Sequence, residues 1–153
     1  MYYIFITNNL ELGDQKYSGK EITDTLLNNN YWLFSYSSPN FKKIKPKDKV
    51  IVYIAGKGNR YFYATFEIKE EIKEHNLTPS NDMEKLLFSM FPLAVQIDKL
   101  HIWGEPLNIK DIKEDLEFIT NKKNYGLFFR QSTKAIDKKD YNLIVSKVNR
   151  GDT

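Results

Sequence analysis

The chain has 153 residues, enough for one domain with a buried core, and its 41% hydrophobic and 28% charged residues are typical of a soluble globular protein. It has no cysteine, which excludes disulfides, thiolate metal sites and cysteine nucleophiles, and no apolar run reaches membrane-spanning length. The formal net charge is only +3. We therefore expect a soluble, cytoplasmic protein that does not enter a membrane.

The first half of the chain is expected to alternate strands with one helix. Hydrophobic patterns between turn residues predict strands over 2–7, 31–36, 49–55 and 61–68. Ser18 and Glu21 have the spacing of a capping box, which predicts a helix over 19–27. Strand 49–55 is apolar on both faces, and a turn joins it to the next strand as a hairpin. In that next strand, one face is expected to carry Phe62, Ala64, Phe66 and Ile68.

The second half contains more helix. The sequence predicts a helix from Pro79 to Met90, one or two strands within 92–103, a helix over 108–119, a strand over 125–129 and a last helix from Asp137. We place the domain at 1–148 and a frayed tail at 149–153. Short strands, helices and a hairpin with a doubly buried strand indicate an α+β fold with a curved, barrel-like mixed sheet flanked by helices.

Basic residues concentrate in two segments, 42–60 with seven and 120–150 with eight. Such segregation indicates that one side of the protein faces phosphates. The alternative is that each of these basic residues is an ordinary solvated surface charge. Phosphates are expected to bind Lys43, the wider Lys42–Lys49 run, Lys57, Arg60, Lys122, Lys123, Arg130 and Lys134.

Several ordered blocks of the sequence resemble the EVE domain of the PUA-like superfamily. They are Tyr3–Asn8, Asn30–Trp32, Ile44–Tyr53, Leu116–Tyr125, Phe129–Arg130 and Asp140–Ile144. The resemblance covers nearly the whole chain and implies a small barrel-like sheet related to the YTH readers of methylated adenine. EVE-type domains are associated with modified bases in DNA or RNA, alone or fused to McrBC-type restriction machinery. Lys47, where the family often has glycine, and the unaligned segment 73–91 depart from its pattern.

The resemblance implies a binding domain without catalytic activity, cofactor or metal. Its ligand would be modified DNA, or alternatively modified RNA, with a base of the 5-methylcytosine type or N6-methyladenine flipped into an aromatic pocket. A fused or associated NTPase or nuclease is the expected partner in modification-dependent restriction.

Candidates for the base pocket are aromatic and amide side chains. Trp32, where the related readers place a cage tryptophan, would stack on the base, and Asn8 or Asn9 would read its edge. Further candidates are Ser35, Trp103 and Tyr63. Each has a structural alternative: the tryptophans suit a hydrophobic core, and the asparagines suit a turn or a helix cap.

Two other classes of function remain open. Asp48, Glu67 and Lys69 satisfy the loose spacing of a metal-dependent nuclease, but a chain rich in Lys and Glu produces this pattern by chance. The histidines His75 and His101 lack metal-ligand spacing. A protein-interaction module, with exposed tyrosines as anchors, is the third class.

Overall fold

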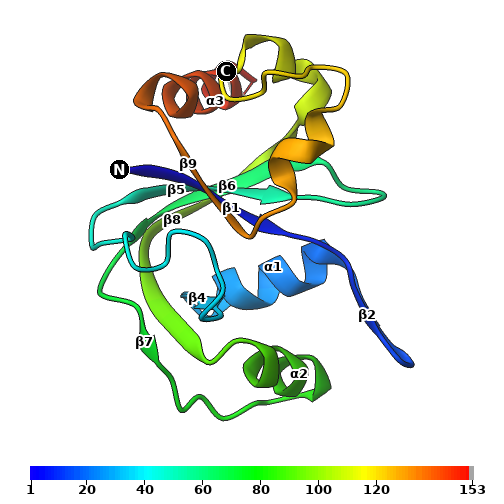
Figure 1. Ribbon diagram of the computed structural model, residues 1–153, viewed down its shortest axis with the longest axis vertical. Helices are drawn as coiled ribbons and strands as arrows, with labels where there is room; N and C mark the ends of the chain where they lie inside the picture. Colours follow the sequence, from blue (N-terminus) through cyan, green and yellow to red (C-terminus); the bar gives the residue numbers. More distant parts are fainter. Residues whose placement is uncertain (152–153) are drawn as a thin grey trace.

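A computed structural model describes residues 1–151 and shows a curled sheet with helices on both of its sides (Figure 1). Its strands are β1 Tyr2–Thr7, β2 Leu10–Leu12, β3 Gln15–Tyr17, β4 Tyr31–Phe34, β5 Lys49–Ile54, β6 Tyr61–Ile68, β7 Lys73–Glu74, β8 Leu93–Asn108 and β9 Thr133–Ile136. Its helices are α1 Gly19–Asn28, α2 Asp82–Met90 and α3 Lys138–Gly151, with short 3-10 turns η1 Ile109–Asp111, η2 Lys113–Asp115 and η3 Tyr125–Phe129. The last two residues of the predicted tail, 152 and 153, lie outside the described part.

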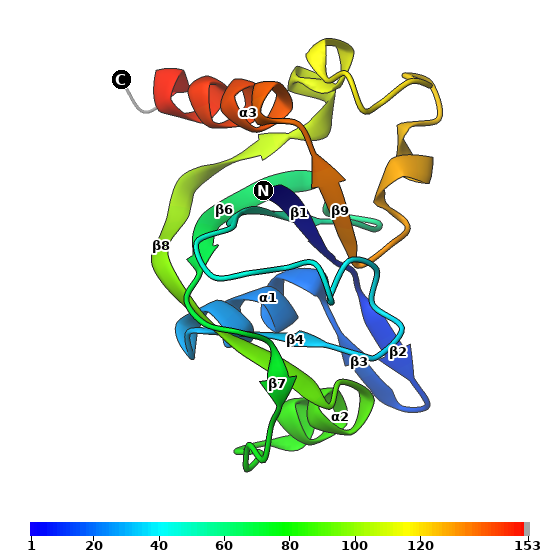
Figure 2. The ribbon, with the colours of Figure 1, turned by 60° about the vertical axis from the view of Figure 1, so that its left-hand side comes forward.

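The main sheet has seven strands in the order β4-β8-β6-β5-β1-β9, with β7 also paired to β8. Strands β1 and β5 are parallel, whereas the other pairs in this sheet are antiparallel. The 16-residue β8 pairs with β4 and β7 at its start and with β6 along the rest, so it curls around the molecule (Figure 2). The α+β class and the curved mixed sheet are confirmed.

Each side of the sheet has its own hydrophobic core. The first lies inside the curl under α1 and α2, and aromatic rings dominate its centre: Phe5, Trp32, Phe34 and Phe66. The second lies under α3 and includes Ile4, Tyr53, Phe62, Phe129 and Ile144. Alternate residues of a strand face opposite sides, which explains why β5 is apolar from Val50 onward. Truncating a buried phenylalanine here to alanine should cost about 3–5 kcal/mol.

A β-bulge overturns one prediction about β6. The register between β5 and β6 shifts where Val52 pairs with Ala64 and Tyr53 with Phe62. Phe62 therefore packs in the second core, whereas Ala64 and Phe66 pack in the first. The expectation that Phe62 shares a face with them was wrong.

Two predicted helices differ in the structure. Helix α2 begins three residues after Pro79, because the Asn81 side chain caps it and accepts a hydrogen bond from the Glu84 backbone N–H at 2.8 Å. Residues 108–119 form only the turns η1 and η2 followed by irregular chain. The Asp140 carboxylate accepts hydrogen bonds from the N–H groups of Glu117 and Phe118, at 2.9 and 3.1 Å, and ties this irregular end of the segment to the start of α3.

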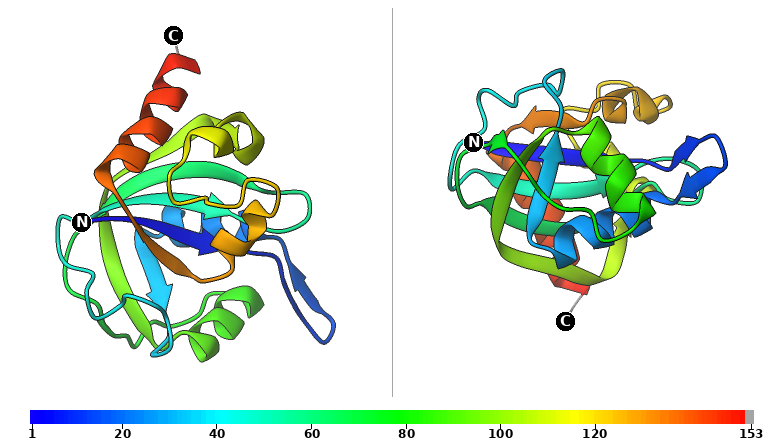
Figure 3. Two further views of the ribbon diagram at one scale, coloured as in Figure 1. Left: turned by 45° about the horizontal axis from the view of Figure 1, so that its top comes forward. Right: turned by 90° about the horizontal axis from the view of Figure 1, so that it is seen from below.

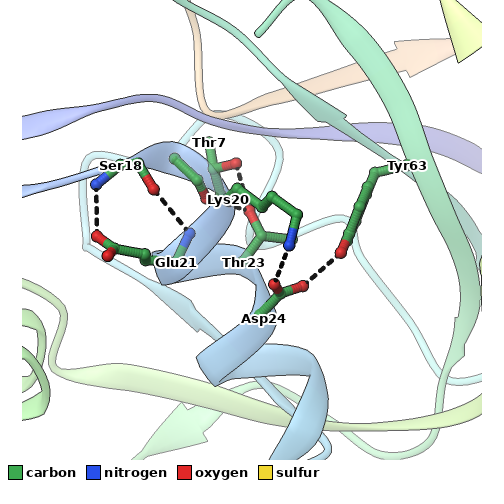
Figure 4. A network of polar contacts seen from close by, with 8 residues as sticks. Thr7, Ser18, Lys20, Glu21, Thr23, Asp24 and Tyr63 are labelled. Atoms are coloured by element: carbon green, nitrogen blue, oxygen red, sulfur yellow. Dashed lines mark hydrogen bonds and ion pairs between the residues drawn. The ribbon is translucent and has the colours of Figure 1, made fainter. Parts of the chain in front are cut away.

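The strand predicted over 125–129 is wrong, since this segment is η3, and the last strand is β9. The helix predicted from the capping box is confirmed. Ser18 Oγ accepts from the Glu21 N–H at 3.1 Å, and the Glu21 carboxylate accepts from the Ser18 N–H at 2.9 Å (Figure 4). Within residues 1–151, no helix is long and apolar enough to cross a membrane.

Candidate nucleic-acid interface

An apolar cavity of about 220 Å³ lies beside the end of β1, between α1, α2 and β4. We call it the base cavity. Its walls include Leu10, Ile22, Leu26, Trp32, Leu87, Met90 and Phe91, and its polar rim includes Thr7, Asn8, Asn9 and Ser38. Three candidates meet here: the neighbouring Asn8 and Asn9 after β1, and Trp32 on β4. Mostly apolar walls with a few polar groups are the usual composition of a site for a small aromatic ligand.

Trp32 belongs both to the core and to the cavity wall. It stands on β4 with only 3% of its surface exposed, and its ring packs against those of Phe5 and Phe66, each with centroids 5.7 Å away. This packing fixes the orientation of the indole before any ligand arrives. The structural alternative is confirmed, since Trp32 is a core residue, and the same side chain also lines the wall of the cavity.

Asn9 ties three segments of the backbone together. Its Oδ1 accepts hydrogen bonds from the Gly19 N–H and from Asn59 Nδ2, both at 2.9 Å, and its Nδ2 donates to the Lys57 carbonyl at 3.1 Å. These bonds join the end of β1 to the start of α1 and to the turn between β5 and β6. Its amide is therefore largely used within the fold.

Asn8 remains the amide available to a ligand. Its Oδ1 accepts from the Asn9 backbone N–H at 2.7 Å, and its Nδ2 has no acceptor among the described residues. A Cβ built on Gly56 would overlap Asn8 Oδ1, so only glycine at position 56 leaves room for this rotamer. The free amide group can donate to a carbonyl or ring nitrogen of a base.

Hydroxyl groups complete the polar rim. The Thr23 hydroxyl donates its one proton to the Gly19 carbonyl, so in the 2.7 Å contact with Thr23 the Thr7 hydroxyl is the donor (Figure 4). The lone pairs of Thr7 thus remain free to accept. Ser38 Oγ accepts from the Ser35 backbone N–H at 2.9 Å. Ser35 itself does not line the cavity; the sequence reasoning missed Ser38, whose only signal was its place three residues later in the same turn.

A second cavity, of about 460 Å³, lies on the other side of the end of β1, and we call it the basic cavity. It shares Ile6, Thr7, Asn8 and Ser132 with the base cavity and adds Tyr53, Arg60, Tyr125, Phe129, Arg130 and Gln131. The rings of Tyr53 and Phe129 stack at 3.9 Å and 18°. The structure thus brings together two of the predicted phosphate ligands, Arg60 and Arg130, one cavity away from Trp32.

Burial raises the pKa of the Tyr53 hydroxyl, and the negative charge of an ionised Tyr125 would raise it further, while the charge of Arg60 opposes the shift. The phenol therefore stays protonated at neutral pH. The Arg60 backbone is fixed from both sides, because its N–H donates to the Ile54 carbonyl and its carbonyl accepts from Ile109 N–H. A strand and a 3-10 turn thus hold Arg60 at the mouth of the basic cavity.

The other predicted ligands of a base lie elsewhere. Trp103 stands on β8 in the second core with 5% of its surface exposed. The Tyr63 hydroxyl donates to Asp24 Oδ1 at 2.6 Å on the far side of α1 (Figure 4). Burial, followed by this bond to Asp24, raises the pKa of Tyr63 to about 12. Neither side chain lines the base cavity or the basic cavity.

The predicted lysines also line neither cavity. Lys122 Nζ donates to the Leu116 carbonyl at 2.6 Å, and Lys134 Nζ lies over the ring of Phe118 at 5.6 Å. Lys43, Lys57 and Lys123 lie on the surface of loops.

The two acidic side chains of the nuclease pattern have structural partners. Asp48 is buried and accepts from the Lys45 N–H at 2.8 Å, while its other oxygen lies 3.3 Å from the N-terminal ammonium. Glu67 pairs with Lys99 at 3.5 Å. Among the described residues, no group of three His, Cys, Asp or Glu is placed to hold a metal ion.

A curled mixed sheet, helices on both sides and paired cavities at the end of β1 define a domain of the PUA-like class. Residues 14–147 match the EVE domain. The chain therefore belongs to the EVE domain family.

Relatives and solved structures agree with this assignment. UPF0310 protein PH1033 of Pyrococcus horikoshii is 26% identical over 94% of this chain and 95% of its own length. Human THYN1, in complex with 5-methylcytosine containing DNA, has the same fold with a TM-score of 0.62 and 11% identity, over 96% of both chains. The N-terminal domain of Staphylothermus marinus McrB has a TM-score of 0.51 and 13% identity, over 95% of this chain and 93% of its own.

Proposed function

We propose that this chain binds nucleic acid and recognises a methylated base that has been flipped into the base cavity. The observation that carries the proposal is the meeting of Trp32 and Asn8 in one small apolar cavity, with Arg60 and Arg130 directly beyond it. Membership of the EVE family supports it, as does the similarity in fold to THYN1, which is seen with 5-methylcytosine containing DNA.

The residues of the cavity suit distinct parts of a base. The indole of Trp32 presents a fixed aromatic wall, and Leu87 of α2 and Phe91, which follows α2, add further apolar walls. Asn8 Nδ2 donates to the base edge, and Thr7 Oγ1 accepts from it. Because one methyl group adds about 0.8 kcal/mol of apolar burial, the preference for the methylated base should be several-fold rather than absolute.

The two arginines hold the phosphates beside the flipped nucleotide. Asn8 lines both cavities, so a base in one and its phosphate in the other would be bridged by the sugar at this residue. Phosphate contacts position the backbone without reading sequence. The planar guanidinium of arginine is suited to a phosphate because it donates two parallel hydrogen bonds.

The domain acts by binding rather than by catalysis in this proposal. Its similarity to the N-terminal domain of McrB supports a role in directing a fused or associated NTPase or nuclease to modified DNA. Modified RNA is the alternative ligand, and the same cavity would accept its bases.

Equilibrium binding to labelled oligonucleotides tests the proposal. DNA and RNA are compared with cytosine, 5-methylcytosine, adenine or N6-methyladenine at one position, using wild type and Trp32→Phe. We expect one methylated ligand to bind several-fold better than its unmodified form, and Trp32→Phe to reduce that ratio. Equal binding to every pair by the wild type would contradict the proposal.

A further inference from the structure

The β2–β3 hairpin stands apart from the body of the domain. It pairs only with itself and projects from the end of β1 (Figure 3). Leu10, at its base, lines the base cavity, and its partner Tyr17 packs against the first core. Two residues further on, Leu12 reaches the end of the strand with 56% of its surface exposed.

The two faces of this hairpin differ. On one face the cross-strand pair Glu11 and Lys16 forms an ion pair at 3.4 Å. The opposite face carries Leu10 and Leu12, because alternate residues of a strand point the same way. On this face Leu10 and Leu12 form an apolar edge from the wall of the base cavity towards the tip, beside Tyr17 and Gln15 of β3, and Leu12 contributes nothing to either core.

Both legs of the hairpin are held firmly. Asn9 immediately precedes β2, and its Oδ1 accepts from the N–H of Gly19, which follows β3 and Ser18. This 2.9 Å bond closes the base of the hairpin, and Gln15 Nε2 donates to the Tyr17 hydroxyl at 3.2 Å along it. A short projection that is closed at its base keeps its tip at a fixed position relative to the cavity.

We propose that Leu12 is a wedge that enters the base stack of a double helix and fills the space left by the nucleotide in the base cavity. The inference rests on the proposed function and adds that the ligand is duplex rather than single-stranded. Flipping a base from a duplex leaves a gap, and leucine is one of the apolar side chains that fill such gaps.

The test compares one modified base in two contexts, a duplex and the same strand alone. Leu12→Ala should weaken binding to the duplex by about tenfold, the factor expected from burying one leucine, and leave binding to the single strand unchanged. Leu12→Met should retain duplex binding. The matched control is Ile102→Ala, which removes another exposed apolar side chain, 38% exposed, from β8 outside both cavities.

Two results would overturn the wedge. One is an equal loss on both ligands, which would make Leu12 a general contact; the other is unchanged duplex binding. A wild type that prefers the methylated base only in single strands would also refute the wedge while leaving the proposed function intact. If the wild type shows no preference for the methylated base in either the duplex or the single strand, the proposed function is refuted instead.

Discussion

Gly56 and Asn8 are in such close contact that any side chain at position 56 would displace the Asn8 amide. Gly56 also has a φ of 95°, and Gly58 in the same turn has a φ of 84° but no atom within 4 Å of the point where a Cβ would lie. Both substitutions to alanine therefore strain the backbone, by about 1 kcal/mol, but only the one at Gly56 brings a side chain against Asn8.

We predict that Gly56→Ala lowers affinity for the methylated ligand by about tenfold, because one base-edge hydrogen bond is lost. Gly58→Ala should keep the wild-type affinity while losing similar stability. Titration of both variants with the same labelled oligonucleotide distinguishes them. Equal affinities for the two variants would show that the Asn8 rotamer does not matter.

Asn8 and Asn9 are adjacent yet should behave oppositely on substitution. Asn9→Ala removes three hydrogen bonds and should lower the free energy of unfolding by about 2–4 kcal/mol. Asn8→Ala removes one exposed bond and should change stability by less than about 1 kcal/mol while weakening ligand binding. Urea unfolding combined with ligand titration checks both; an Asn8 variant that is unstable but binds normally would reverse the assignment.

Arg60 and Arg130 should account for part of the salt dependence of nucleic-acid binding. If Arg60 and Arg130 each neutralise one phosphate, each Arg→Gln substitution should reduce the slope of log K against log salt by about 0.9, equally for methylated and unmethylated ligands. Lys99→Gln is the control, because Lys99 stands on β8 and pairs with Glu67 away from both cavities. A changed methyl preference in the arginine variants would indicate that they contact the base instead.

Tyr63 gives a prediction for alkaline pH. The folded state raises the pKa of Tyr63 from 10.0 to about 12, so the folded protein retains a proton that the unfolded chain has lost. The contribution of this group to stability is complete below pH 10 and is lost as the pH rises through about 12. Tyr63→Phe should therefore lose stability less steeply than wild type in urea unfolding from about pH 9 to 11. Parallel curves for the two proteins would contradict the shift.

Local sequence patterns correctly predicted those helices and strands whose structure does not depend on contacts with distant residues. The alternation in β1 and the capping box at Ser18 specify structure within a few residues, so both were predictable. The helix expected over 108–119 is absent, and the backbone near the end of this segment binds Asp140, more than 20 residues away, which no local pattern indicates. Strand β8 is long because it pairs first with β4 and then with β6. No local sequence pattern indicates this change of partner.

The site could be predicted only in part, for similar reasons. The family resemblance directed attention to Trp32 and Asn8, and the structure brings them together. Thr7 has no local signal and Ser38 only its place in the turn after Ser35, since the position of both at the rim follows from tertiary packing. Whether Trp103 faced a pocket or a core depended on the path of the curled sheet, and it faces the second core.

The most direct test of base recognition is the fluorescence of Trp32 itself. The chain has two tryptophans, and Trp103 lies in the second core, so Trp103→Phe leaves Trp32 as the only indole. We predict that a methylated oligonucleotide quenches this emission saturably, at the concentration where anisotropy reports binding, because the base stacks against the indole. Saturable binding with unchanged Trp32 emission would place the base elsewhere and contradict the proposed site.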